Sequence, residues 1–252
     1  MLKSVDHAVD GIIQNQLQSG KPLAVILAGH NGSGKSTLWY NKLADKLQIP
    51  LINADRMMLS ILPEIKDRQP LPRWAVKLRD KDEAWMKVVQ RGVLSFVDNA
   101  MVSMVPFAME TVFSEWRKRP DGSIGSKIDL IAKLQANGYY VVLLFVGLVN
   151  KELSILRVQS RVLGGGHNVE VSKLRDRFPR TQHAIRKAVE IADASILVDN
   201  SGPPDDAQVV RVQERTDVIF DIRQGATPAP SAAIREWLSV VCPEKEPEDA
   251  QQ

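Results

Sequence analysis

The 252-residue sequence has little cysteine, no long apolar run and no strong excess of either charge. Its one cysteine, Cys242, excludes an intramolecular disulfide; it lies beside Pro243, away from any candidate His or Asp partner, so we expect it to be inert. The longest apolar run, residues 139–149, is about half the length of a membrane-spanning helix, and the N-terminus starts with polar and acidic residues instead of a signal sequence. We therefore expect a cytoplasmic protein with no membrane partner.

The balance of charges also argues against nucleic acid as a partner. The net charge is +3, and the basic clusters at residues 117–119 and 173–187 are diluted by nearby acidic residues, which favours a solvated surface. Apolar residues make up 44% of the chain and charged residues 25%, as in ordinary folded proteins. At this length we expect a single domain over residues 1–242, followed by a flexible tail over 243–252.

Strand patterns alternate with helical patterns along the chain. An N-terminal helix over 1–20 is followed by a strand at 23–28, a helix at 35–47 and a strand at 51–54, a unit that predicts a parallel sheet. After an irregular connection over 61–80, we expect further strands at 107–112, 139–148 and 195–198, and helices at 83–104, 124–136, 151–163 and 172–192, the last interrupted at 178–179. A hairpin over 209–223 and a closing helix over 230–241 complete the chain. The sequence thus predicts an α/β fold, a doubly wound parallel sheet of about five strands.

A glycine-rich motif lies between the first expected strand and the next helix. Residues 29–36 read Gly-His-Asn-Gly-Ser-Gly-Lys-Ser and match G-x-x-x-x-G-K-[ST] at every fixed position. In such a phosphate-binding loop, or P-loop, backbone N–H groups surround the phosphates, Lys35 reaches the β- and γ-phosphates, and the Ser36 hydroxyl binds Mg²⁺. We therefore predict ATP or GTP, with Mg²⁺, as cofactors. The predicted nucleotide contacts are Gly29, His30, Asn31, Gly32, Ser33, Gly34, Lys35, Ser36 and Thr37.

The P-loop alone does not identify a reaction, because motors, switches, transporters and kinases share it. The chain has neither an apolar run ending in an Asp-Glu pair nor a base-recognition signature of switch GTPases, which favours a small-molecule kinase. A kinase needs a carboxylate that takes the proton of the acceptor hydroxyl, and Asp55 and Glu110 both follow expected strands at the sheet edge that carries the P-loop.

Three further polar residues have positions that suit a kinase. Arg157 and Arg161 lie four residues apart, hence on one helix face, where they could cover the γ-phosphate as part of a lid region over 157–180. Asn200 follows the last core strand, where P-loop kinases commonly hold adenine.

Four segments, taken in order, resemble the zeta-toxin family of P-loop kinases. Besides the P-loop they are Asn53-Ala54-Asp55, the strand end at 109–114, and the stretch from Arg157 to Arg161 with Gly165-Gly166-His167 after it; the resemblance spans residues 23–201. It implies a P-loop kinase-like fold, phosphorylation of the sugar of UDP-N-acetylglucosamine, and an antitoxin protein as partner.

The same resemblance assigns roles to individual residues. It implies Asp55 as catalytic base and Glu110 with Thr111 as substrate contacts; the structural alternatives are that Asp55 caps a helix and that Glu110 and Thr111 form buried hydrogen bonds. The best-known members place another arginine where this chain has Gly-Gly-His, so His167 and Arg177 are further candidates for the substrate side. Arg91 is a candidate from the 83–104 helix, which we expect to line the substrate side.

Two other functions stay open at this point. One is a kinase for another nucleotide-containing metabolite or a small alcohol, because substrate-reading loops vary most in such folds. The other is a non-catalytic, nucleotide-dependent interaction module whose N-terminal helix binds a partner. Lys35, Ser36 and Asp55 together disfavour the second.

Overall fold

In the computed structural model, which describes residues 4–64, 71–120, 122, 124–203, 206–226 and 228–244, the centre of the fold is a seven-stranded sheet. The strand order is β2 (Leu51–Ile52), β3 (Phe107–Thr111), β1 (Leu23–Gly29), β6 (Tyr140–Gly147), β7 (Ala194–Asp199), β8 (Gln208–Glu214) and β9 (Asp217–Asp221). The strands from β2 to β7 are parallel, and the hairpin β8–β9 adds an antiparallel edge. The predicted parallel sheet and C-terminal hairpin are confirmed.

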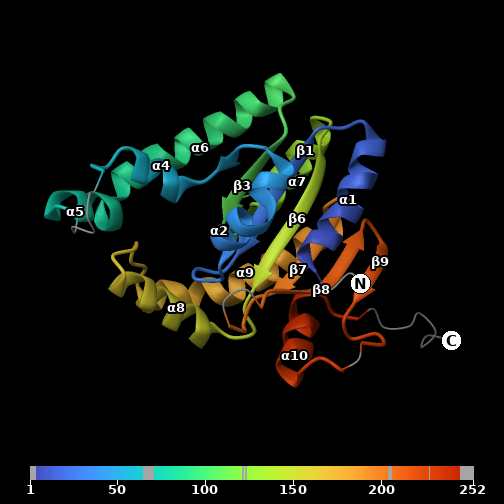
Figure 1. The fold of residues 1–252 in the computed structure, drawn as a ribbon. Helices are drawn as coiled ribbons and strands as arrows, with labels where there is room; N and C mark the ends of the chain where they lie inside the picture. The colour runs from blue at the N-terminus through green and yellow to red at the C-terminus, as the bar shows by residue number, and fades with distance from the viewer. Residues whose placement is uncertain are drawn as a thin grey trace.

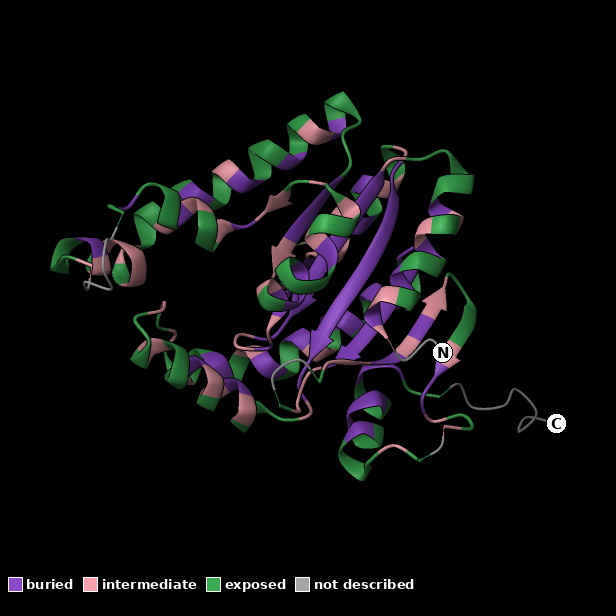
Figure 2. Cartoon of the chain, in the orientation of Figure 1, coloured by how far each residue is buried: buried purple, intermediate pink, exposed green. Residues whose placement is uncertain are grey.

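Helices cover both faces of this sheet, as a doubly wound fold requires (Figure 1). One face packs against α1 (Val5–Ser19), α2 (Lys35–Leu38) and the π-helical turn η1 (Trp39–Leu43), which continues into α3 (Ala44–Leu47). The other face packs against α6 (Glu83–Ser103), α7 (Ile128–Ala136), α9 (Val171–Ile191) and α10 (Ala232–Val241). Because β1 and β6 are buried on both faces, their sequences are continuous apolar runs (Figure 2).

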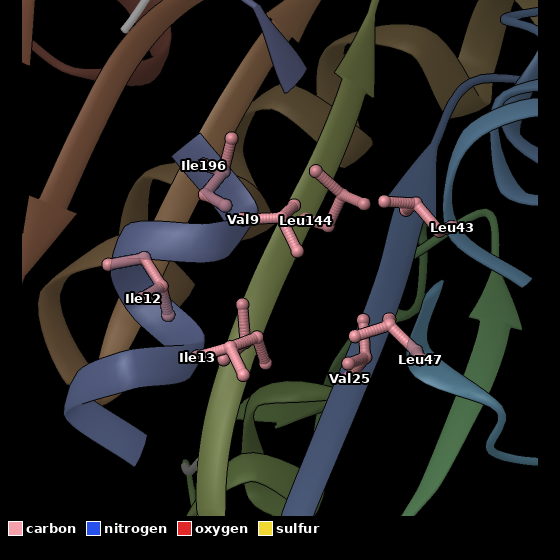
Figure 3. Close-up of a pocket in the computed structure, with 9 residues that line it drawn as sticks. Val9, Ile12, Ile13, Val25, Leu43, Leu47, Leu144 and Ile196 are labelled. Carbon is pink, nitrogen blue, oxygen red and sulfur yellow. The ribbon is translucent and has the colours of Figure 1, made fainter. Parts of the chain in front are cut away.

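The N-terminal helix α1 is part of this core. Its residues Val9, Ile12 and Ile13 line an apolar gap together with Val25 of β1 and Leu144 of β6 (Figure 3). The apolar gap left between them has a volume of about 10 Å³, which is no more than one water needs. A partner could therefore bind only the outer side of α1.

Three expectations about secondary structure are wrong. The 61–80 connection contains a helix, α5 (Arg73–Lys81), which follows α4 (Ala54–Ser60), contacts α6 and buries Ala75. Because many residues of α5 are charged, the periodicity of its few apolar residues does not predict a helix. Residues 65–70 of that connection lie outside the described residues.

The other two errors concern helix boundaries. Residues 124–126 are not helical but form β5 (Ile124–Ser126), paired with β4 (Trp116–Lys118) across a turn in which Gly122 N donates to Arg119 O. Asp121 lies outside the described residues. The predicted break at 178–179 is absent, and α9 runs through Pro179. The buried residues Phe178 and Thr181 on either side anchor the helix, which offsets the lost hydrogen bond.

Most of the other predicted elements lie near their expected positions, but β2 ends at Ile52 and α4 begins at Ala54, within the strand expected over 51–54. Helix α8 (Lys151–Leu163) matches the predicted span, α6 and α10 match within two residues, and α1 begins at Val5 beyond the undescribed residues 1–3. Cys242 is buried at the end of α10, and burial raises the pKa of its thiol to about 11, as suits an inert cysteine. Residues 245–252 of the predicted tail lie outside the described residues. Within the described ranges, no helix combines the length and apolar character needed to cross a membrane.

Candidate active site

The P-loop connects the end of β1 to the start of α2, and its backbone leaves no room for side chains at two glycines. A Cβ on Gly29 would lie 2.3 Å from the carbonyl oxygen of Val146. At Gly34, where φ is +85°, a Cβ would lie 2.4 Å from Nδ2 of Asn200. The glycines of the motif therefore permit a close backbone approach as well as the turn itself.

The ammonium group of Lys35 is folded back onto the P-loop. Its Nζ donates to the carbonyl oxygens of Gly29 (3.1 Å) and His30 (2.9 Å), and the residue is only 8% exposed. Burial lowers the pKa of Lys35; the negative charges of Glu110 and Asp55 oppose this effect. These two predicted functional carboxylates thus lie within electrostatic reach of the lysine.

His30 contributes its backbone to the P-loop, while its side chain is part of the core. The imidazole stacks on Phe178 of α9 and meets Phe145 of β6 edge to face. Burial, with a smaller effect of Lys35, lowers the pKa of His30 to about 3, so the ring is neutral at physiological pH. Any contact of His30 with a nucleotide would therefore use its main chain.

Glu110 bridges the P-loop and the strand next to it. The hydroxyl of Ser36 donates to Glu110, with both carboxylate oxygens at 3.0 Å, and Nδ2 of Asn53 donates to Glu110 Oε2 at 2.5 Å. The parallel pairing of β1 with β3 sets Leu27 opposite Glu110, which brings this carboxylate to the P-loop end of the sheet. The sequence motif Asn53-Ala54-Asp55 gave Asn53 no role of its own, although its position before a helix is a recognisable capping signal.

Asp55 is exposed and has a different role from Asn53. The side chain of Asn53 caps α4, accepting from the N–H groups of Asp55 (2.8 Å) and Arg56 (3.2 Å). Among the described residues, no hydrogen-bond partner is seen for the carboxylate of Asp55. The capping alternative for Asp55 is therefore not supported, and its carboxylate is available to a ligand.

Arg177 of α9 lies within electrostatic range of Asp55. Burial, and to a lesser extent the positive charge of Arg180, lower the pKa of Arg177, and the charge of Asp55 acts in the opposite direction. Thr111, in contrast, uses its hydroxyl locally, accepting from the N–H of Phe113 at 3.2 Å.

The two lid arginines make different contacts. Arg157 donates to the carbonyl oxygens of Asn200 (2.7 Å) and Gly202 (2.8 Å), so it fixes the loop after β7. Arg161 donates to the carbonyl oxygen of His167 at 2.8 Å, and its charge lowers the pKa of Lys35, which places it near the P-loop.

A cavity of about 470 Å³ lies beside the P-loop. Its walls include Gly34 and Thr37 from the P-loop, Arg157 and Asn200 from the lid side, and the first turn of α1 around Asp6. Nδ2 of Asn200 also donates to the carbonyl oxygen of Ser33 at 2.7 Å. The sequence did not predict that α1 contributes to this cavity, because the contribution depends on how α1 packs against the rest of the fold.

Arg91 is a candidate that no described contact brings to the P-loop. It is exposed on α6, on the side away from the buried residues Val89 and Val93, and no described contact joins its side chain to the P-loop. Its predicted role in substrate binding stays a prediction.

The donor atoms present fit a Mg²⁺ ion that arrives with a nucleotide. Ser36 and Glu110 offer hydroxyl and carboxylate oxygens, the ligand type that Mg²⁺ prefers. The described residues hold no group of three or more His, Cys, Asp or Glu side chains that could enclose a metal ion. Mg²⁺ commonly needs only one or two protein ligands, completed by phosphate oxygens and water.

The chain is similar in sequence or in fold to several known proteins. An uncharacterised protein of Haemophilus influenzae is 31% identical over 156 residues, which cover 62% of this chain and 91% of that protein. A crystal structure of AvrRxo1-ORF1:AvrRxo1-ORF2 with sulphate ions matches with a TM-score of 0.58 and 12% identity, covering 96% of this chain and 71% of that one. The same complex with ATP matches with a TM-score of 0.57 and 13% identity, covering 92% and 68%. At these identities the structural matches show a shared fold.

The family model described as "Zeta toxin" matches residues 7–224. This range contains the P-loop, Asp55, Glu110, both lid arginines and Asn200. Because the match covers most of the chain, the protein belongs to the zeta toxin family, as the order of its motifs predicts.

Proposed function

We propose that this protein is a kinase that transfers the γ-phosphate of ATP or GTP to a hydroxyl group of a small metabolite. The observation that carries the proposal is the placement of the exposed Asp55 carboxylate within electrostatic reach of the P-loop lysine, Lys35. Phosphoryl transfer needs this combination, a cation at the phosphates and a base for the acceptor hydroxyl. Membership in the zeta toxin family supports the same class of reaction.

Each residue of the site has a separate role in the reaction. Backbone N–H groups of the P-loop hold the phosphates, and Lys35 exchanges its contacts with Gly29 and His30 for the β- and γ-phosphate oxygens. Ser36 and Glu110 would hold Mg²⁺, which, when bound, neutralises charge on the phosphates. Asp55 takes the proton of the acceptor hydroxyl, and Arg161 stabilises the charge of the transferred group.

The cavity beside the P-loop supports a nucleotide as the donor. Its volume of about 470 Å³ is in the range of small-molecule sites, and Gly34 and Thr37 of the P-loop form part of its wall. A nucleoside in this cavity would have its phosphates at the P-loop. Asn200 would then contact the base or sugar, as its sequence position predicts.

For the acceptor, we propose the sugar of UDP-N-acetylglucosamine. The resemblance to characterised zeta toxins supports this choice. Arg177, which lies within electrostatic range of Asp55, would suit the diphosphate of such an acceptor. Glu110 and Thr111 would select the hydroxyl that reacts.

The direct test is to incubate the purified protein with UDP-N-acetylglucosamine and either Mg-ATP or Mg-GTP, and to look by mass spectrometry for a gain of one phosphate on the sugar nucleotide. We expect product with at least one donor. If nucleotide is consumed but the sugar nucleotide is unchanged, the acceptor proposal fails and the kinase proposal stands. The same assay with a metabolite extract would then show whether the acceptor is another nucleotide-containing metabolite or a small alcohol.

A toxin of this kind would need an antitoxin as a partner, and we propose one on the basis of the family. Expression of the wild-type chain in a bacterial host should stop growth, and expression of Lys35→Ala should not. Equal growth of the two strains at equal protein levels would contradict a toxin role in that host.

A further inference from the structure

The loop between α8 and α9, residues 164–170, is held by contacts with the end of α5. Nδ1 of His167 lies 2.8 Å from Oδ1 of Asp80, at the end of α5. Nη1 of Arg79 donates to the carbonyl oxygen of Gly165 at 3.1 Å, although the two residues are 86 positions apart in sequence. Arg79 also donates to both oxygens of Asp80, at 2.8 and 3.0 Å. We call Arg79, Asp80 and His167 the latch.

The latch connects two groups of helices that extend from opposite sides of the P-loop. Helices α4, α5 and α6 extend from one side of the P-loop, and α8 extends from the other (Figure 1). The end of α5 and the loop after α8 meet at the outer ends of these two arms. A closed arrangement of this kind limits the access of water to a reaction site between the arms.

The charges in the latch are partly buried and mutually satisfied. The side chains of Arg79 and Asp80 are 11% and 12% exposed, and that of His167 is 22% exposed. Burial alone would raise the pKa of the Asp80 carboxyl, but hydrogen bonds from Arg79 and His167 outweigh it and lower the pKa. Asp80 is therefore ionised at neutral pH, and charge-assisted hydrogen bonds of this kind are stronger than neutral ones.

The latched loop in turn holds Arg161. Nη2 of Arg161 donates to the carbonyl oxygen of His167 at 2.8 Å. The loop also packs on the stem of this arginine, because a Cβ on Gly166 would lie 2.5 Å from Cγ of Arg161. Arg161 therefore depends on the loop for its orientation, and the loop depends on α5.

We propose that Arg79 and Asp80 are positioning residues, which hold the glycine loop and Arg161 over the P-loop during phosphoryl transfer. This inference rests on the proposed kinase function. It adds to that function a closure, in which α5 contacts the loop between α8 and α9. The pairing of His167 with Asp80 accounts for the histidine at the position where the Gly-Gly-His segment departs from the best-known family members.

The test uses Asp80→Asn, which keeps the shape of the side chain and removes its charge. We expect kcat for nucleotide turnover to fall about ten- to a hundred-fold, because a shift of about 1 Å in a group that contacts the reacting phosphate has an effect of this order. The KM for nucleotide should stay within about two-fold, since the P-loop is untouched. Asp82→Asn is the matched control: Asp82 caps α6 through Ala84 N and Trp85 N, a role that Asn also performs, and this variant should match the wild type.

A double variant distinguishes a latch from two independent structural roles of Asp80 and His167. If Asp80 and His167 act as one unit, Asp80→Asn combined with His167→Ala should lose about as much kcat as the more damaged single variant. Asp80→Glu should recover part of the lost kcat. A combined loss equal to the product of the two single losses, or an unchanged kcat in Asp80→Asn, would overturn the proposal.

Amide hydrogen exchange provides a readout that needs no turnover. Asp80→Asn should speed the exchange of loop amides at 164–168 and leave β1 and β6 unchanged. No acceleration in the loop would overturn the latch. An active wild type with an unaffected Asp80→Asn variant counts against the latch alone, whereas a wild type with no nucleotide turnover counts against the proposed function.

Discussion

The imidazole of His30 stacks on the ring of Phe178, with 4.0 Å between the ring centroids and 14° between the planes. This contact joins the P-loop to α9, the helix that also carries Arg177. In addition, Nε2 of His30 is buried and has no hydrogen-bond partner among the described residues. The P-loop is therefore anchored by a histidine that the fold keeps uncharged.

The first prediction follows from this anchor. The pKa of His30 is about 3 in the native state and 6.5 ordinarily, so the unfolded chain takes up a proton between these values and the native chain does not. The contribution of His30 to stability is therefore complete above about pH 6.5 and is lost as the pH falls. From about pH 8 to about pH 5, wild type should lose about 2 kcal/mol more unfolding free energy than His30→Leu. Urea denaturation at the two pH values measures this, and an equal loss in both proteins would contradict it.

A second prediction concerns the P-loop lysine. Lys35→Ala should reduce nucleotide turnover by more than about a thousand-fold, because it removes the side-chain cation placed at the β- and γ-phosphates. Lys133→Ala is a suitable control, since Lys133 forms an exposed ion pair with Asp98. Turnover of Lys35→Ala within a few-fold of the wild type would defeat the kinase assignment.

The third prediction separates the two lid arginines. Arg161→Ala should lower kcat by about a hundred-fold with a smaller rise in KM, because its charge acts mainly on the transition state. Arg157→Ala should mainly raise the KM for nucleotide, since Arg157 holds the carbonyl groups of Asn200 and Gly202 beside the donor cavity.

Steady-state kinetics of both variants, with Arg175→Ala as an exposed control on α9, would test this division. A rise in KM without a change in kcat for Arg161→Ala would make Arg161 a ground-state contact. A large loss of kcat with an unchanged KM in Arg157→Ala would show that both arginines act on the transition state.

The parts of the site that the sequence predicts are those formed by local signals. The P-loop lies between a buried strand and a helix, and every residue that its motif needs is adjacent in sequence. Asp55 and Glu110 were also expected at this edge, because parallel strands end side by side. The chain order of the zeta-toxin motifs identified the family without structural information.

The parts that the sequence did not predict depend on distant partners. The latch was missed because Arg79 and Asp80 find their partners some 86 residues later in the chain, and α5 was expected to be irregular. Two arginines on one helix face were expected to act alike, but only the structure shows that Arg157 is held by the loop after β7. Pro179 was expected to break α9, and burial of its neighbours overrides that local rule.

The measurement that tests the account most directly is phosphoryl transfer by Asp55→Asn. Wild type, Asp55→Asn and the exposed control Asp45→Asn would be incubated with nucleotide labelled in the γ-phosphate and the acceptor, and nucleotide binding would be measured in parallel. Because the variant loses the base and keeps the P-loop, we predict a fall in transfer of at least about a hundred-fold for Asp55→Asn. Its nucleotide affinity should stay near that of the wild type, and Asp45→Asn should be fully active. Transfer by Asp55→Asn at the wild-type rate would contradict the assignment of Asp55 as the catalytic base.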